Sequence, residues 1–201
     1  WKSRVDLNRP DLQFVFSPAS FRAGVVGLLD KVPGMTCGVW QERPESTGYV
    51  EARSADPYDA PIIQPNYLAE EKDQQVLLAG MRLARNLMRT SALAPYFDKE
   101  LVPGDNVESD EEFLDFARCQ GTTVYPLIGT AKMGPASDPQ AVVDDQLRVH
   151  GIESLRVVDA SIMPTMPSAN TNAAVLMIAE KASDMITGRP APSPGAINES
   201  H

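Results

Sequence analysis

The sequence predicts an α+β fold, in which an antiparallel sheet packs against helices. Three observations support this class. A short apolar run stands at 14–16, two extended stretches flank a turn at 44–48, and apolar residues recur with helical spacing in 70–89 and 172–187. With 201 residues and 43% hydrophobic content, the chain can bury one ordinary core or two smaller ones.

The first strand is predicted around Phe14-Val15-Phe16, as a buried strand that Pro18 ends. Further on, the extended stretches 39–43 and 49–53 surround a segment of turn-forming residues, Pro-Glu-Ser-Thr-Gly. This order is typical of an antiparallel hairpin, so the two stretches are expected to pair with each other.

The longest predicted helix covers 70–89, where Val76, Gly80 and Ala84 fall on one face. Ser109 followed by Glu112 forms a capping box and predicts a second helix over 110–118. After Gly121, the segments 122–130 and 154–164 read as short buried strands. The last helix is expected over 172–187, and 189–201, rich in Pro, Gly and Ser, as a flexible tail.

Composition narrows the class of partner. A formal net charge of −9 argues against a nucleic-acid surface, and two distant cysteines with two histidines predict neither a metal site nor a disulfide framework. No apolar run reaches the roughly 20 residues of a membrane span. A cytoplasmic protein is expected, and the start at Trp1, without an initiator Met, suggests a piece of a longer chain.

The head of the last helix is the most informative stretch, "PSANTNAA" at 167–174. One explanation is structural: Ser168, Asn170 or Asn172 caps the helix. The other is functional, because a helix N-terminus presents unpaired N–H groups and positive potential to an anion.

This stretch, the "VVDAS" block at 157–161 and "RSADPYDAPIIQPNYL" at 53–68 together resemble the glucose-methanol-choline (GMC) family of FAD-dependent oxidoreductases. The resemblance implies that 1–120 belongs to a substrate-binding domain with an antiparallel sheet. It implies that 121–188 completes an α/β FAD-binding domain. The cofactor-binding residues it implies are Asp159, Ala160, Asn170, Thr171, Asn172 and Ala173.

The activity implied is oxidation of a small alcohol by hydride transfer to flavin N5, with Asn170 as a catalytic residue that hydrogen-bonds the substrate oxygen. Backbone N–H groups at 171–173 would stabilise negative charge on the reduced flavin. The family usually has a His as base where this chain has Pro126. His150 reads as a solvated-turn residue, and the adjacent Tyr125, with a phenol pKa near 10, would be a poor base.

Two alternatives follow. Pro126 is compatible with a GMC paralogue whose chemistry is lost or rerouted. The absence of a GxGxxG motif means that FAD must be held mainly by an N-terminal portion, either of the same protein or of a partner flavoprotein on which this chain docks as a subunit. By itself the chain is expected to be inactive.

Overall fold

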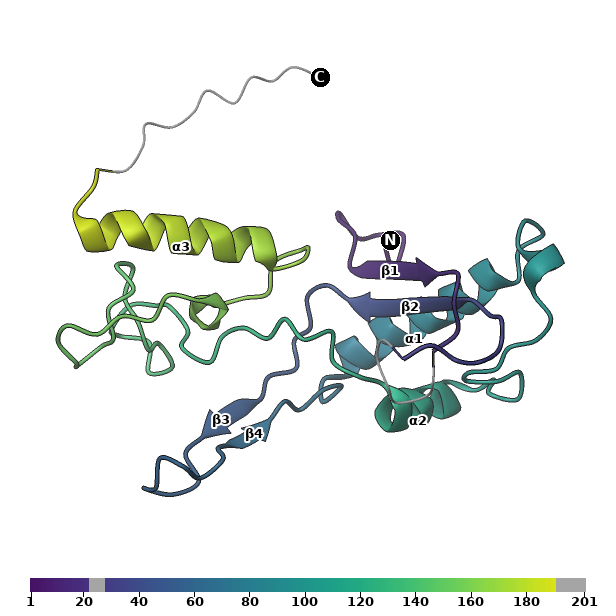
Figure 1. Cartoon of the computed structure of the whole chain (residues 1–201), viewed down its shortest axis with the longest axis horizontal. Helices are drawn as coiled ribbons and strands as arrows, with labels where there is room; N and C mark the ends of the chain where they lie inside the picture. Colours follow the sequence, from purple (N-terminus) through teal and green to yellow (C-terminus); the bar gives the residue numbers. More distant parts are fainter. Residues whose placement is uncertain (22–27, 191–201) are drawn as a thin grey trace, which may run out of the picture. The chain divides into compact units, whose positions relative to one another are not determined.

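A computed structural model describes residues 1–21 and 28–190 (Figure 1). The chain divides into two compact units. One consists of Trp1–Tyr125 with Pro167–Ala169, and the other of Pro126–Met166 with the chain from Asn170 onward. Helices and antiparallel strand pairs occur together in the described residues, as the α+β prediction requires. The predicted tail lies outside the described residues from position 191 onward.

The first unit contains a two-stranded antiparallel sheet of β1 (Leu12–Ser17) and β2 (Thr36–Gln41). The strand predicted around Phe14 is confirmed, but its burial is not, because Val15 and Phe16 are 44% and 52% exposed. Successive side chains of a strand point to opposite faces. Leu12 lies on the face that meets α1 and is buried, whereas Val15 lies on the opposite face.

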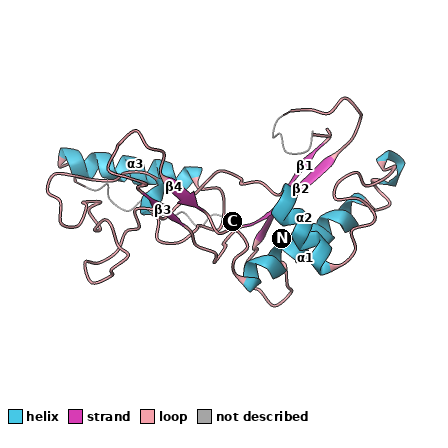
Figure 2. Ribbon diagram, turned by 90° about the horizontal axis from the view of Figure 1, so that it is seen from below, coloured by secondary structure: helices cyan, strands magenta, loops and turns pink. Residues whose placement is uncertain are grey.

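The helix α1 (Glu71–Met88) packs along β2, as Figure 2 shows, and confirms the predicted long helix. Besides Asp73, its buried residues are Val76, Gly80 and Ala84, which are four apart and form one face. Gly80 permits the close approach of helix and sheet. A Cβ there would lie 2.8 Å from Val39 Cγ2 and 3.0 Å from Leu12 Cδ2.

The predicted hairpin is wrong in its pairing. The strand β3 (Tyr49–Glu51) does form, but its partner is β4 (Ile62–Gln64), with Tyr49 opposite Gln64. The other stretch belongs to β2 and pairs with β1. The segment between them is not a hairpin turn, because its backbone is bound to the first turn of α1.

That connection is made by Asp73, a carboxylate that is only 1% exposed. It accepts hydrogen bonds from Gln41 Nε2 (2.9 Å), from the Glu45 amide (2.9 Å) and from the Ser46 amide (2.7 Å). The Ser46 hydroxyl also donates to Asp73 and accepts the amide of Glu70 at 3.1 Å. Residues 41–46 therefore satisfy the buried carboxylate and help to cap α1, which has no cap from its own N-cap side chain.

The helix α2 (Asp110–Gln120) confirms the predicted capping box, in which Ser109 accepts the Glu112 amide and Glu112 accepts the Ser109 amide. Hydrogen bonds from the backbone of Ser109 and Glu108 hold the pKa of the Glu112 carboxyl below its ordinary value. Phe113 of this helix is buried, and its ring centroid lies 4.4 Å from the Arg85 guanidinium of α1.

Arg85 also makes a two-pronged ion pair with Glu100, through hydrogen bonds of 2.8 and 2.7 Å. Both side chains are 12% exposed, so water screens this pair less than a surface pair. Arg85 further donates to the carbonyl oxygens of Gly104 and Val107. One arginine thus fastens the irregular segment between α1 and α2 to the helix pair.

Asp73→Asn should lower the free energy of unfolding by about 2 kcal/mol at pH 7, because an amide cannot accept from all the donors now facing both oxygens. Burial raises the pKa of Asp73, but the hydrogen bonds from Ser46, Glu45 and Gln41 outweigh it, so the pKa is lowered. The stabilisation is therefore fully present above the pKa of an unfolded-state aspartate, about 4. It is lost as the pH falls through the lower pKa that Asp73 has in the folded protein.

Urea unfolding of the wild type and the variant between pH 7 and pH 3 measures this effect. The difference between the two proteins should shrink as the pH falls. The control is Asp98→Asn, at an exposed carboxylate of the same unit, and it should leave stability nearly unchanged. An equal effect of both substitutions would contradict the role given to Asp73.

Candidate functional site

The second unit is held together by one apolar cluster beneath α3 (Asn172–Thr187), which confirms the predicted last helix. The buried members of this cluster are Val143, Leu147, Ile162, Met163, Ile178 and Ala182. Apart from α3 and one short 3-10 turn, the described part of this unit is mostly irregular chain that runs under the helix (Figure 1). The predicted site residues all lie in this unit.

The two short strands predicted after Gly121 are wrong. Within the described residues, 122–130 and 154–164 contain only an isolated bridge, Arg148 to Arg156, instead of ladders. The first segment is also not buried, since Tyr125 and Leu127 are 67% and 54% exposed. In the second segment, carbonyl oxygens accept from a neighbouring loop: Ala131 donates to the Ser161 carbonyl oxygen (3.0 Å) and Met133 to that of Ile162 (2.8 Å).

Asp159 and Ala160 occupy the beginning of the 3-10 turn η2 (Ala160–Ile162). Asp159 is the N-cap, and its carboxylate accepts the Ser161 amide at 2.8 Å and the Ser161 hydroxyl. The turn ends in Ile162 and Met163, which are buried in the core. The buried side chains of Ile162 and Met163 thereby anchor the Asp-Ala-Ser turn, while the Asp159 carboxylate stays exposed.

Asn170, Asn172 and Ala173 are exposed at the head of α3, and Thr171 beside them is buried. The N-cap is Thr171, which already has helical dihedral angles and makes no side-chain capping bond. The structural explanation of this stretch, that Ser168, Asn170 or Asn172 caps the helix, is therefore wrong. The first backbone bond here is from Val175 N to Thr171 O (2.9 Å), and 172–174 donate to no other described residue.

The head of α3 differs in this respect from those of the other two α-helices that the structure describes. The first turns of α1 and α2 carry acidic residues, Glu71 and Asp73 in one and Asp110, Glu111 and Glu112 in the other, whereas α3 has none. Ser46 or Ser109 also accepts an amide at each of those two helices. Among the residues that the structure describes, none caps the positive end of α3 and its first turn holds no acidic side chain, an arrangement suited to an anionic or charge-accepting ligand.

Pro126 lies exposed at the start of the second unit, in the position where the family resemblance expects a His. Three residues later, Gly129 adopts a φ of 88°, which strongly favours glycine, and a Cβ there would lie 3.5 Å from the Met163 carbonyl oxygen. The segment after Pro126 therefore runs beside the end of η2. A Gly between Ile and Thr is the sequence signal for such a bend.

His150 lies in a turn, as predicted, but it is only partly solvated and has a structural contact. Its ring is partly buried, and Nε2 donates to the Gly134 carbonyl oxygen over 3.0 Å. It lies beside a hollow of about 530 Å³ in the second unit. No group of three or more His, Cys, Asp or Glu side chains in 1–21 and 28–190 is placed to hold a metal ion.

Comparison with known proteins identifies the family. The family model described as GMC oxidoreductase matches residues 44–179, so the chain belongs to the GMC oxidoreductases. It is 45% identical over 191 residues to human mitochondrial choline dehydrogenase, covering 94% of this chain and 32% of that protein. It is 40% identical over 189 residues to alcohol dehydrogenase [acceptor] of Pseudomonas putida, covering 92% and 33%.

Among solved structures, a variant of formate oxidase from Aspergillus oryzae RIB40, studied for modification of its FAD, matches with a TM-score of 0.78 and 29% identity. The match covers 90% of this chain and 32% of that one. The chain thus spans about a third of the length of the relatives it matches. None of the helices in the described residues is long and apolar enough to cross a membrane.

Proposed function

We propose that this chain is the C-terminal part of an FAD-dependent enzyme that oxidises a small alcohol. FAD, when bound, supplies an acceptor for hydride at its N5 atom. The observation that supports the proposal most is the uncapped head of α3, which combines free amides with exposed Asn170 in a chain of GMC type. The chain alone is proposed to be inactive, because it lacks the GxGxxG motif that binds a dinucleotide.

The donors at the head of α3 fit a flavin. The amides of Asn172, Ala173 and Ala174 have no acceptor among the described residues, and the first turn contains no carboxylate that would repel negative charge. In the proposed complex, the backbone at 171–173 stabilises negative charge on the bound ring system. Asp159 and Ala160, on the fixed turn η2, bind a more distant part of the same cofactor.

Asn170 is proposed to orient the substrate. Its side chain is exposed and engaged in no hydrogen bond with the rest of the described chain, so its amide is free to bind an alcohol oxygen. Residues 1–120 would contribute the substrate-binding part, and 121–188 would complete the FAD-binding domain. The remaining FAD-binding portion comes from the same polypeptide or from a partner chain, and a cytoplasmic location stays a prediction.

The substrate class follows from two relatives whose names specify choline and alcohol. We propose a small primary or secondary alcohol, with choline as the first to be tested. Pro126 favours a second candidate, a GMC protein with lost or rerouted chemistry, because a proline side chain can neither accept nor donate the hydroxyl proton.

In the complete FAD-containing protein, at least one alcohol of a panel that includes choline should reduce the flavin. Stopped-flow measurement of the flavin absorbance follows this reduction as bleaching. Asn170→Ala should slow the reduction by about 10²-fold, because it removes a polar contact that orients the reacting oxygen. Asn8→Ala, a matched change at an exposed position of the first unit, should have no effect. Failure of every alcohol to bleach the flavin would favour the paralogue with lost chemistry.

Pro126→His tests whether the missing base limits the rate. In the complete protein it should raise the rate of flavin reduction by about 10²-fold, in the range of a positioned general base. The gain should also depend on pH through the imidazole group. Leu127→His, at the neighbouring exposed position, is the control and should give no gain. No change with Pro126→His would mean that another group removes the proton, or that proton removal does not limit the rate.

A further inference from the structure

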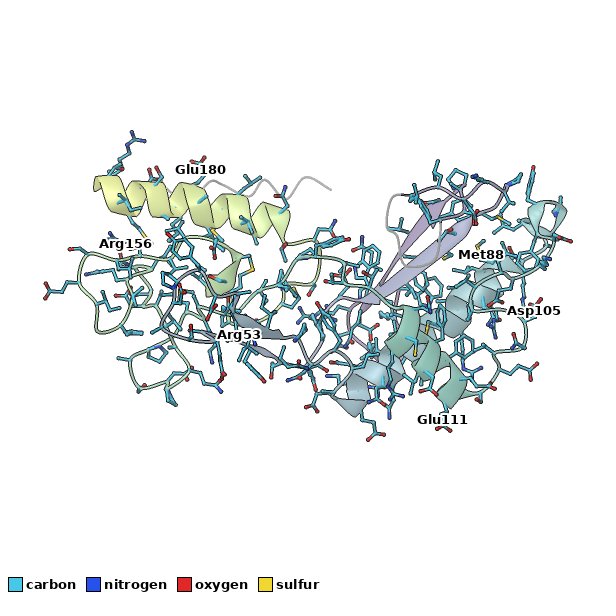
Figure 3. All side chains as sticks on the ribbon, turned by 60° about the horizontal axis from the view of Figure 1, so that its bottom comes forward. Arg53, Met88, Asp105, Glu111, Arg156 and Glu180 are labelled. Atoms are coloured by element: carbon cyan, nitrogen blue, oxygen red, sulfur yellow. The ribbon has the colours of Figure 1, made fainter. Side chains whose placement is uncertain are left out.

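The outer face of α3 changes character along the helix. In the first two turns this face is apolar, with exposed Ala173, Leu176 and Met177. The side chains of Leu176 and Met177 are 60% and 57% exposed. In the later turns the same face is polar, with exposed Glu180 and Ser183. Ile186 is also 58% exposed, but its spacing of four residues from the buried Ala182 places it on the side of the core, away from this outer face. Figure 3 shows Glu180 on the side of α3 turned away from the chain beneath it.

The opposite side of the helix is already used. Ile178 and Ala182 are 8% and 1% exposed and belong to the core of the second unit, so Leu176 and Met177 are not part of that packing. A surface helix normally presents polar residues to water on its outer face, as the later turns of α3 do. An apolar patch confined to one half of such a face is typical of a surface that another polypeptide covers.

We propose that the FAD-holding region covers the outer face of the first two turns of α3 and leaves the later turns in water. This inference rests on the proposed function and names the surface of this chain at which its missing part docks. The patch adjoins the head of the helix, because Ala173 belongs both to the patch and to the proposed cofactor site. A polypeptide that brings FAD to the amides of 172–174 must therefore pass next to Leu176.

The length of the chain favours this occupant over a second copy. The chain spans about a third of the length of its relatives, so about two thirds of each relative has no counterpart in this chain. A second copy would cover Leu176 without bringing the dinucleotide-binding motif that this sequence lacks, and the site would stay incomplete. The polar half of the face marks the limit of the contact, since burying Glu180 without a partner would be costly.

Cysteine labelling tests the surface directly. Leu176→Cys and Ser183→Cys are each introduced together with Cys119→Ser, which removes the exposed native thiol. Cys37 is left in place, because burial raises the pKa of its thiol and slows its reaction. Each variant is treated with a maleimide, both as the 201-residue chain and as the complete FAD-containing protein, and mass spectrometry of the modified peptide gives the rate.

In the 201-residue chain both introduced thiols should react at similar rates. In the complete protein Leu176→Cys should react at least about 10-fold more slowly, because only accessible thiolates are attacked, while Ser183→Cys keeps its rate. Equal rates of Leu176→Cys in the two proteins would overturn the proposal. So would protection in the 201-residue chain that grows with its concentration, since a second copy would then be the occupant. Protection of Leu176→Cys in a complete protein whose flavin no alcohol bleaches would support the docking surface and reject the proposed activity.

Discussion

The unsatisfied N-terminus of α3 is the constraint on which the rest of the second unit depends. Amides without acceptors are tolerated where they face water or a ligand, and they are costly where they are buried. The helix must therefore be held firmly along one side while its head stays open. Ile178 and Ala182 hold it to the core, and the buried Thr171 fixes the first turn. The exposed residues on either side of Thr171 are then presented at fixed positions.

In the first unit, by contrast, the N-terminus of α1 is closed by hydrogen bonds. At α1 the buried Asp73 collects donors from three residues of another segment, and Ser46 accepts an amide of the helix. These bonds occupy polar groups in the first turn of α1, and the turn thereby links the helix to residues 41–46. The same electrostatics apply to both heads, but hydrogen bonds from the chain close the head of α1, while no described residue caps the head of α3.

The sequence predicts local features well and long-range pairing poorly. All three α-helices were predictable, because apolar spacing and the Ser109–Glu112 box are local signals. The hairpin was mispaired, because its intervening segment is bound by Asp73, which lies 27 residues from Ser46 along the chain. Nothing near that segment signals this contact. Of the strands expected after Gly121, the first is too exposed for a buried strand, and carbonyl oxygens of the second accept from a loop instead of another strand.

The residues of the candidate site stay a prediction from the family resemblance, whereas the lack of a side-chain cap at the head of α3 is visible only in the structure. The resemblance pointed to Asp159 and to Asn170–Ala173, yet Ser and Asn near a helix start are ordinary caps, and only the geometry excludes that explanation. The lack of acidic residues in the first turn of α3 was visible in the sequence, and it gains meaning beside α1 and α2, which both have them. The role of Pro126 stays a prediction, because its chemistry depends on groups outside this chain.

Hydrogen exchange at the amides of Asn172, Ala173 and Ala174 tests the central claim most directly, in the complete protein with FAD and after its removal. Amides without acceptors exchange readily, and a bound acceptor protects them. The account predicts that FAD slows exchange at the head of α3 markedly, while the first turn of α2, closed by its own capping box, is unchanged. Equal exchange at 172–174 with and without FAD would contradict it.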